Sequence, residues 1–519
     1  MTSQIKMLVE EIVLNRDPNS RSGCAAAFGA IHTHVGSLAA GPLLKTSVNM
    51  LMSLSNDPHP LVHFCAIKSL AKVIDSASLA YAPFVPSTLG MLFKVHTLDS
   101  HEAEGGTLAY ANISGDLPTY QAVCQVIDGV ITVLGPDIQE SNHARSLVID
   151  LVRSFLAEED EGICVEAIKC IQHFLMFAAE HARIPSLVSQ FRVHMLSPRT
   201  PLKVASINAL YQLVQKDAIS MSKLGGDQLV EELFGMLDND PSIEGVRNVI
   251  LAWLQQTAIH NPSAWIDLCQ RIMSKTTATQ RIVESVTTGT TLHDDEGESL
   301  SVGIIQDSAS LNRAYNFSRW RTQLFALQCL HDICGIVGRS GRQEHINLPY
   351  AKLNGIPTHG LLVTRVPDLI KMAFTASAAY VPEIRLEGLK VLRDVIEVRP
   401  AAVIAISNRT DQYQVFAASP DPLYTDSLLL EQHQAPITAA LTPAFSSDTT
   451  PEILALAIET CAVFVGCGVV KDVGRMGRIL KHLTSALEQS KGGFIEFLDT
   501  RSFDSQRHRN GDPVSWGRG

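Results

Sequence analysis

Residues 56–75, NDPHPLVHFCAIKSLAKVID, decide the fold of this 519-residue chain. They place His59, His63 and Cys65 close together, a pattern that suits a metal site, a nucleophile with its base, or a structural repeat. The dipeptide 57–58, Asp-Pro, breaks the chain, because proline cannot continue a helix and restricts the residue before it. After the break, apolar residues recur at helical spacing, at Val62, Ala66, Leu70 and Val73. The stretch therefore predicts a turn followed by an amphipathic helix.

The preceding segment, LLKTSVNMLMSLS (43–55), predicts the first helix of a helical hairpin. Its apolar face consists of Leu44, Val48, Leu51 and Leu54. The same order of apolar helix, turn with proline or acidic residues, and second apolar helix recurs at 147–175, 187–214, 229–254, 366–396 and 435–465. Where copies follow one another directly, the period is about 40 residues, as in HEAT and armadillo arrays. We therefore predict an all-α fold, an α-solenoid of HEAT/armadillo-like helical hairpins.

The second helices can be aligned on one position, which is small in most units and lets neighbouring helices approach closely. The aligned residues are Ala27, Ala66, Gly129, Ala167, Ser206, Ile250, Ala326, Gly388 and Ala457. Three positions earlier, where HEAT repeats commonly carry a basic residue that bridges adjacent units, stand His63, Lys203, Arg247 and Arg385. This alignment predicts a structural role for His63, with His59 in the turn and Cys65 on the helix flank. A zinc site would need a second ligand pair nearby in the sequence, and there is none.

A second candidate cluster lies in RWRTQLFALQCLHDICGIVGR (319–339). There a helix would place His331 beside Cys334, with Cys329 close by. An enzyme using Cys329, His331 and Cys334, or a metal site at His59 and His63, is the alternative from another functional class. The preferred interpretation is an amphipathic helix with buried thiols. We predict no catalytic, cofactor-binding or metal-binding residue, and no enzyme activity.

Charge and cysteine usage restrict the protein further. The net charge is −11 and no long Lys/Arg run occurs, which argues against nucleic-acid binding. The ten cysteines are scattered and form no CxxC pair, which is typical of a reducing compartment. The N-terminus lacks the apolar core of a signal peptide. Residues 453–470 come nearest to a membrane span, but Glu459 in their middle favours a buried helix. We expect a soluble, cytosolic protein.

The predicted organisation has four parts. An N-terminal HEAT-repeat array, 1–274, carries an insertion at about 99–118. An acidic Ser/Thr-rich tract, 275–312, lacks helical periodicity and is predicted to be a disordered insertion. A C-terminal HEAT-repeat array follows at 313–495, and a polar tail, predicted to be disordered, occupies 496–519.

Several segments resemble one family of HEAT-repeat proteins. They are GCAAAFGAIHTHVGSLAAGPLLKTSVNMLMSLSND (23–57), SLAKVIDSASLAYAPFVPSTLGMLF (69–93), VITVLGPDIQ (130–139) and, less specifically, WRTQLFALQCLHDI (320–333). The family is that of the large proteins that accompany the type-1 clathrin adaptor, the HEAT repeat-containing protein 5 or large AP-1 accessory family. Its members are much longer than this chain, so the resemblance implies a fragment or a truncated homologue.

The resemblance also implies a function. It implies a non-enzymatic scaffold for sorting between the trans-Golgi network and endosomes, with the type-1 clathrin adaptor complex and its accessory proteins as partners. It implies a cytoplasmic protein associated peripherally with the trans-Golgi network, endosomes or clathrin-coated vesicles. Membrane contact is expected to be indirect, because the sequence shows no anchor or basic amphipathic helix. Another HEAT scaffold, of the nuclear-transport or phosphatase type, is the alternative, and the oligomeric state is open.

Overall fold

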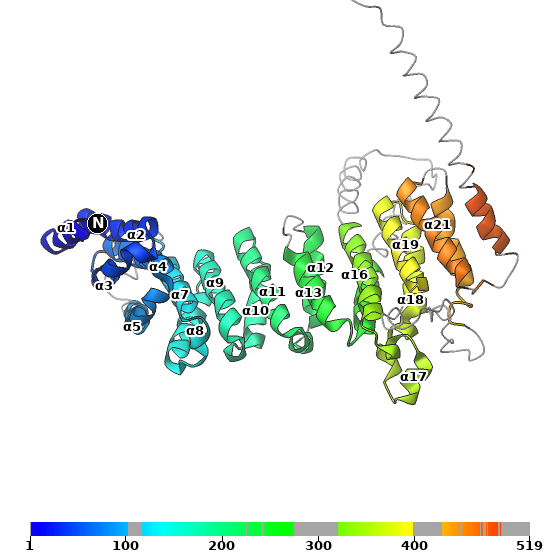
Figure 1. The fold of residues 1–519 in the computed structure, drawn as a ribbon, viewed down its shortest axis with the longest axis horizontal. Coiled ribbons are helices and arrows are strands. Elements are labelled where there is room, and N and C mark those ends of the chain that lie inside the picture. Colours follow the sequence, from blue (N-terminus) through cyan, green and yellow to red (C-terminus); the bar gives the residue numbers. More distant parts are fainter. Residues whose placement is uncertain are drawn as a thin grey trace, which may run out of the picture. The chain divides into compact units, whose positions relative to one another are not determined.

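The computed structural model describes residues 2–101, 117–224, 226–239, 243, 245–274, 320–397, 428–446, 449–467 and short segments between residues 469 and 488. Its regular secondary structure within these residues is helical (Figure 1). The helices pair into hairpins that stack on their neighbours along the sequence. The predicted all-α solenoid is thereby confirmed. The predicted insertion 275–312 and the tail 496–519 lie outside the described residues, as does most of the insertion at 99–118.

The chain divides into two compact units, the first made of Met1–Gly226 and Ile243–Ala252, the second of Asp227–Ser242 and Trp253–Gly519. The helices of the first unit are α1 Thr2–Leu14, α2 Pro18–Val35, α3 Ser37–Leu54, α4 Pro60–Ala77, α5 Val85–His101, α7 Thr119–Leu134, α8 Asn142–Leu156, α9 Glu161–Ala178, α10 Ile184–Met195 and α11 Thr200–Lys223. Two further helices, α12 Gly226–Asn239 and α13 Gly245–Thr257, contain the residues at which the division falls.

The first unit is built in two layers of helices. The second helices of the hairpins form one layer, in which α2 contacts α4, α4 contacts α7, α7 contacts α9, and α9 contacts α11. The first helices form the other layer: α3 packs on α4, α8 on α9, and α10 on α11. The apolar stripes read from the sequence face the space between the layers. Val62, Ala66, Leu70 and Val73 of α4, for example, are all fully buried.

The second unit repeats this arrangement. Its helices are a helix over 262–274, α16 Trp320–Arg339, α17 Leu348–Leu353, α18 Val366–Ser377, α19 Pro382–Glu397, α20 Gln434–Leu441 and α21 Pro451–Gly466. Neighbouring second helices again contact one another, α16 with α19 and α19 with α21, while α18 packs on α19 and α20. Arg365 ties this array to the helix over 262–274, donating to Ser263 Oγ at 2.7 Å and pairing with Asp267 at 2.6 Å.

Proline and carboxylates define where the second helices begin. Pro18, Pro60 and Pro451 each stand in the first turn of a helix, where the missing N–H costs nothing. The Asp17 side chain accepts from the Ser20 N–H at 3.0 Å, and Asp160 accepts from the Gly162 N–H at 2.7 Å. These caps satisfy backbone donors that have no partner inside the helix.

Glycine permits the closest helix contacts. A Cβ on Gly129 of α7 would lie 2.7 Å from Ile74 Cγ2 of α4, and one on Gly29 of α2 would lie 3.1 Å from the Ser69 Cα of α4. The aligned small position is fully buried in α4, α9, α16 and α21. In α2 the alignment is wrong, because Ala27 is half-exposed and Gly29, two residues later, makes the close contact.

Among the described residues one helical segment, Glu161–His181, is long and apolar enough to cross a membrane by length and composition. It contains α9, which packs against α7, α8 and α11, and half of its most apolar window is buried in the fold. The segment that the sequence singled out, 453–470, overlaps α21, whose Ile453 and Phe464 are buried. Glu459 of α21 pairs with Arg393 of α19 at 3.1 Å. Both segments are thus packed as helices of the solenoid.

Candidate interaction site

His63 holds the end of the preceding helix. Its side chain is fully buried, and its Nδ1 lies 2.5 Å from the carbonyl oxygen of Ser55, the C-cap residue of α3. His59 is the exposed N-cap residue of α4, and its backbone N–H donates to Asp57 at 2.9 Å. Cys65 is half-buried. This geometry agrees with the structural role that the alignment predicts for His63 and with the place it gives to His59.

The position of His63 meets backbone carbonyl groups in other repeats as well. Cys164, at the same place in α9, has its Sγ 3.2 Å from the Glu158 carbonyl oxygen after the end of α8. Arg385 of α19 donates to the Pro443 carbonyl oxygen of the next hairpin at 2.8 Å. In α4 and α9 the residue at this position thus contacts the end of the first helix of its own hairpin, and in α19 it reaches the next hairpin. Ion pairs at other positions join neighbouring hairpins too, Arg21 with Asp57 and Arg199 with Glu161.

The second cluster does not converge on one point. Cys329 and Cys334 of α16 are buried, and burial raises the pKa of both thiols. His331 is half-exposed, and its Nδ1 is hydrogen-bonded to the carboxylate of Asp394 on α19. This hydrogen bond raises the pKa of His331, although burial lowers it, and the nearby Glu387 carboxylate adds to the rise. The histidine thus links two stacked helices.

We expect the contribution of the His331–Asp394 pair to depend on pH. Because the pKa of His331 is raised above that of the unfolded chain, the pair contributes fully below pH ~6.5 and is lost as the pH rises through the higher folded pKa. Asp394→Asn should therefore lower the melting temperature more at pH 5.5 than at pH 9. The effect should stay below about 1 kcal/mol, because the histidine is partly solvated. In a His331→Gln background the loss should be independent of pH; the same pH dependence there would contradict the assignment.

The remaining thiols show the same chemistry. All ten cysteines are free, and all but Cys65 and Cys467 are buried. Burial raises the pKa of Cys164 to about 11 and that of Cys269 and Cys461 to about 12. A thiol acts as nucleophile or metal ligand through its thiolate, so these groups stay in their unreactive form near neutral pH. Within the described ranges, no group of three or more His, Cys, Asp or Glu side chains is placed to hold a metal ion. The absence of catalytic and metal-binding residues stays a prediction.

The described part of the first unit contains a cavity that the sequence did not reveal. We call it the α8–α10 groove. It lies between α8, the end of α9 with the following turn Ala179–His181, and the start of α10. The empty space is about 540 Å³, a volume that includes open solvent at the mouth. Its lining is Val148, Ile149, Val152, Arg153, Leu156, Ile171, Phe174, His181, Ala182, Arg183, Ser186, Leu187 and Gln190.

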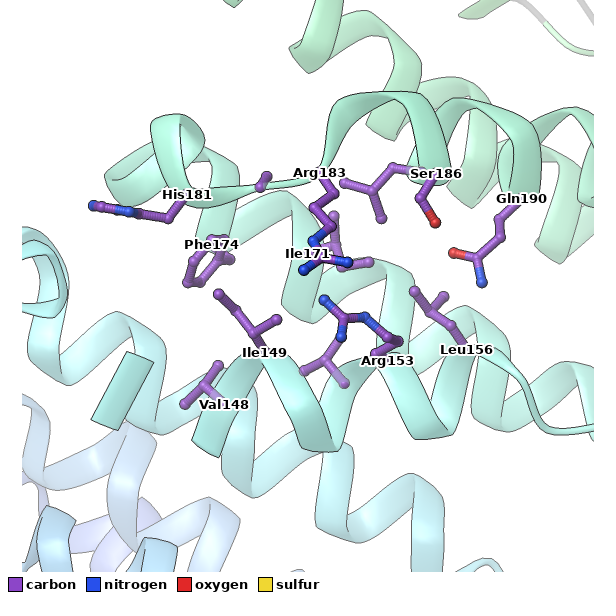
Figure 2. A pocket seen from close by; sticks show the side chains of 13 residues that line it. Val148, Ile149, Arg153, Leu156, Ile171, Phe174, His181, Arg183, Ser186 and Gln190 are labelled. Atoms are coloured by element: carbon purple, nitrogen blue, oxygen red, sulfur yellow. The ribbon is translucent and has the colours of Figure 1, made fainter. Parts of the chain in front are cut away.

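The groove combines an apolar floor with polar side chains at its mouth. We call the apolar lining residues, among them Ile149, Ile171 and Phe174, the floor of the groove, and Figure 2 shows these three beside the guanidinium groups of Arg153 and Arg183, which point toward one another. Ser186 and Gln190, one turn apart on α10, lie at the other side of the guanidinium groups (Figure 2). None of the lining residues is acidic. The arrangement can therefore bind an apolar group together with an anion.

Sequence reasoning missed this groove because its parts are dispersed. Arg153 lies in the last turn of α8, and Arg183 is the N-cap residue of α10. A basic residue in the last turn of a helix, as Arg153 is, has an ordinary role, since it compensates the dipole or caps carbonyl groups. A single arginine before a helix, as Arg183 is, forms no motif by itself. Only the packing of α8 on α9, together with the turn that leads from α9 into α10, brings the two arginines to a common cavity.

Comparison with known proteins shows that the chain is similar to a family of HEAT-repeat proteins. Residues 361–401 and 410–510 match the model of the Laa1/Sip1/HEATR5 HEAT repeat region. Over 466 residues the chain is 23% identical to the protein SWEETIE of Arabidopsis thaliana, covering 88% of the chain and 20% of SWEETIE. It is 18% identical to the AP-1 accessory protein LAA1 of Saccharomyces cerevisiae, covering 95% of the chain and 25% of LAA1. The chain thus spans a fifth to a quarter of these relatives.

Solved structures give weaker likenesses. An engineered protein is 14% identical, with a TM-score of 0.40 and coverage of 94% of this chain and 98% of that protein. Kap121p is 12% identical, with a TM-score of 0.42 and coverage of 96% of this chain and 46% of Kap121p.

Proposed function

Because the chain belongs to the Laa1/Sip1/HEATR5 family of HEAT-repeat proteins, we propose that it is a non-enzymatic scaffold in clathrin-adaptor-dependent vesicle traffic. It supports protein sorting between the trans-Golgi network and endosomes. Its partners are the type-1 clathrin adaptor complex and accessory proteins. It works in the cytoplasm, at the periphery of the trans-Golgi network, endosomes or clathrin-coated vesicles, and reaches the membrane through these partners.

The observation that carries the proposal is the similarity to LAA1, which bears the name of an AP-1 accessory protein and matches 95% of this chain. Physical features are consistent with a scaffold. Stacked hairpins present long surfaces, and a solenoid acts through such surfaces. Eight of the ten cysteines are buried, and His63 and His331 are engaged in contacts between helices. The net charge of −11 disfavours direct binding to nucleic acid or to an anionic membrane.

Affinity purification tests the proposal. The tagged chain, expressed in cells and recovered under mild salt, is expected to enrich the subunits of the type-1 clathrin adaptor over a clathrin adaptor of another type and over the tag alone. Binding to the purified adaptor complex in solution would then exclude an indirect association. Recovery of a nuclear-transport GTPase or of phosphatase catalytic subunits, without the type-1 adaptor, would contradict the proposal and favour the other class of HEAT scaffold.

A further inference from the structure

We propose that the α8–α10 groove binds a short peptide of a partner protein in which an Asp or Glu carboxylate lies beside an aliphatic or aromatic side chain. The apolar floor would take the apolar side chain, and the two arginines at the mouth would take the carboxylate. The inference deepens the proposed scaffold function by naming the peptide that one pair of repeats recognises. It rests on that function only in that the chain works by binding proteins.

The floor of the groove is lined by apolar side chains. Val148, Ile171 and Phe174 are largely buried in the core, yet their side chains line the cavity from below. Ile149 and Leu187 are half-buried and form its walls on α8 and α10. An aliphatic or aromatic side chain bound there would move from water into contact with apolar side chains on several sides. Burial of apolar surface is the main favourable contribution to such binding.

The two arginines are the reason for proposing that the ligand carries an anionic group. A guanidinium group is planar, stays charged at all ordinary pH values and binds carboxylates through paired hydrogen bonds. Among the described residues Arg153 has Asp150 as its one ion-pair partner, at 3.8 Å, and both side chains are more than half exposed, so this pair contributes little. Arg183 is exposed and makes no ion pair within the part of the chain that the structure describes. Two facing cations repel each other, and a carboxylate between them relieves this repulsion.

Two further side chains favour a peptide. Ser186 and Gln190 lie on the same face of α10, four residues apart, and both can donate and accept hydrogen bonds. A peptide backbone needs donors and acceptors of this kind along its length. An acidic lipid surface is disfavoured as the ligand, because the chain as a whole carries a net charge of −11 and is repelled by anionic membranes. A local cationic site on an acidic chain suits a short acidic segment instead.

Peptide selection tests the inference on the intact 519-residue protein. A phage library of random 12-residue peptides is selected on the wild type and on the variant Arg153→Glu/Arg183→Glu. Wild-type selections are expected to be enriched in Asp or Glu beside Leu, Ile, Val or Phe. Synthetic copies of these peptides should bind the variant at least about tenfold more weakly in fluorescence anisotropy. The substitutions remove the charge-assisted hydrogen bonds and replace two positive charges by negative ones. Arg153→Gln/Arg183→Gln should give an intermediate loss.

The matched control is Lys45→Glu/Lys72→Glu, which makes the same change of charge at two exposed lysines of α3 and α4. It should bind the peptides like the wild type, and circular dichroism should show equal melting for all four proteins. The inference would be overturned if the selected peptides lacked an acidic residue beside an apolar one. It would also be overturned if the peptides bound the Arg153→Glu/Arg183→Glu variant as tightly as the wild type. A third contrary result would be that no peptide is selected, while phosphatidylserine vesicles bind the wild type and do not bind this variant.

The two proposals fail separately. If the selected peptides bind the groove but the type-1 adaptor is not recovered with the chain, the trafficking function is wrong and the groove stands. If the adaptor is recovered equally with the wild type and the Arg153→Glu/Arg183→Glu variant and no acidic peptide is selected, the groove assignment is wrong and the trafficking function stands.

Discussion

Protein carrying Ala66→Trp is expected to exchange the backbone amide hydrogens of α4 about a hundredfold faster than the wild type. Ala66 is fully buried in a helix that packs against α2, α3 and α7 at once. Close-packed interiors hold no room for an indole ring, so the neighbouring helices must separate or α4 must open. A cost of about 3 kcal/mol, at the upper end of what overpacking usually causes, corresponds to two orders of magnitude in the opening equilibrium.

Hydrogen exchange followed by mass spectrometry is the suitable measurement. Each repeat of a solenoid contacts only its neighbours, so the damage should stay in α2, α3, α4 and α7 and leave the second unit protected. The control is Ala26→Trp, because Ala26 of α2 is exposed and the ring can extend into water. Unchanged exchange in α4, or the same exchange in both variants, would show that Ala66 does not lie at a tight helix contact.

The hairpins were predictable because their determinants are local. The range 366–396 was read as two helices with a turn, and the structure has α18 Val366–Ser377 and α19 Pro382–Glu397 there. An apolar residue every three or four positions fixes the buried face, and proline after the turn fixes where the second helix begins. The same two signals gave α3 with α4 and α10 with α11. Periodicity needs no knowledge of the partner helix, so it can be read from one sequence.

The residues that form contacts between helices were harder to predict. In α2 several small residues follow one another, so spacing alone could not separate Ala27 from Gly29, and only the position of Ser69 on α4 decides between them. The connection over 340–365 has no sustained periodicity, yet it contains α17 and is tied down by His345, whose Nε2 lies 2.9 Å from the Ile259 carbonyl oxygen. Such contacts depend on the stacking of repeats and leave no local pattern.

The same limit applies to the sites. A helix does place His331 and Cys334 on neighbouring turns, as the sequence indicated, but the hydrogen-bond partner of His331 is Asp394, 63 residues away. Arg153 and Arg183 belong to different hairpins, the first in the last turn of α8 and the second before the first turn of α10. What a motif search can find is a set of residues close in sequence. A motif search cannot find a groove whose lining residues come from three different helices.

Gly388→Ala is expected to destabilise the second unit, although alanine is the better helix former. In a helix interior the exchange of glycine for alanine gains about 1 kcal/mol. At Gly388 of α19, however, the new Cβ would lie 2.6 Å from the Ala376 Cβ and 3.3 Å from the Ala373 carbonyl oxygen, both on α18. Neither atom can move by a side-chain rotation, so the two helices must separate. The resulting overpacking costs about 1–3 kcal/mol and should outweigh the gain.

Gly235→Ala, in the same unit, is expected to change stability in the opposite direction. Gly235 lies inside α12, and a Cβ there meets no atom within 4 Å, so only the gain in helix propensity of up to about 1 kcal/mol remains. Amide exchange should become faster in α18 and α19 for Gly388→Ala, and slower in α12 for Gly235→Ala. Circular dichroism should show a lower melting temperature for the first variant and an equal or higher one for the second. Increased protection of α19 in Gly388→Ala would mean that α18 and α19 are farther apart than the structure places them.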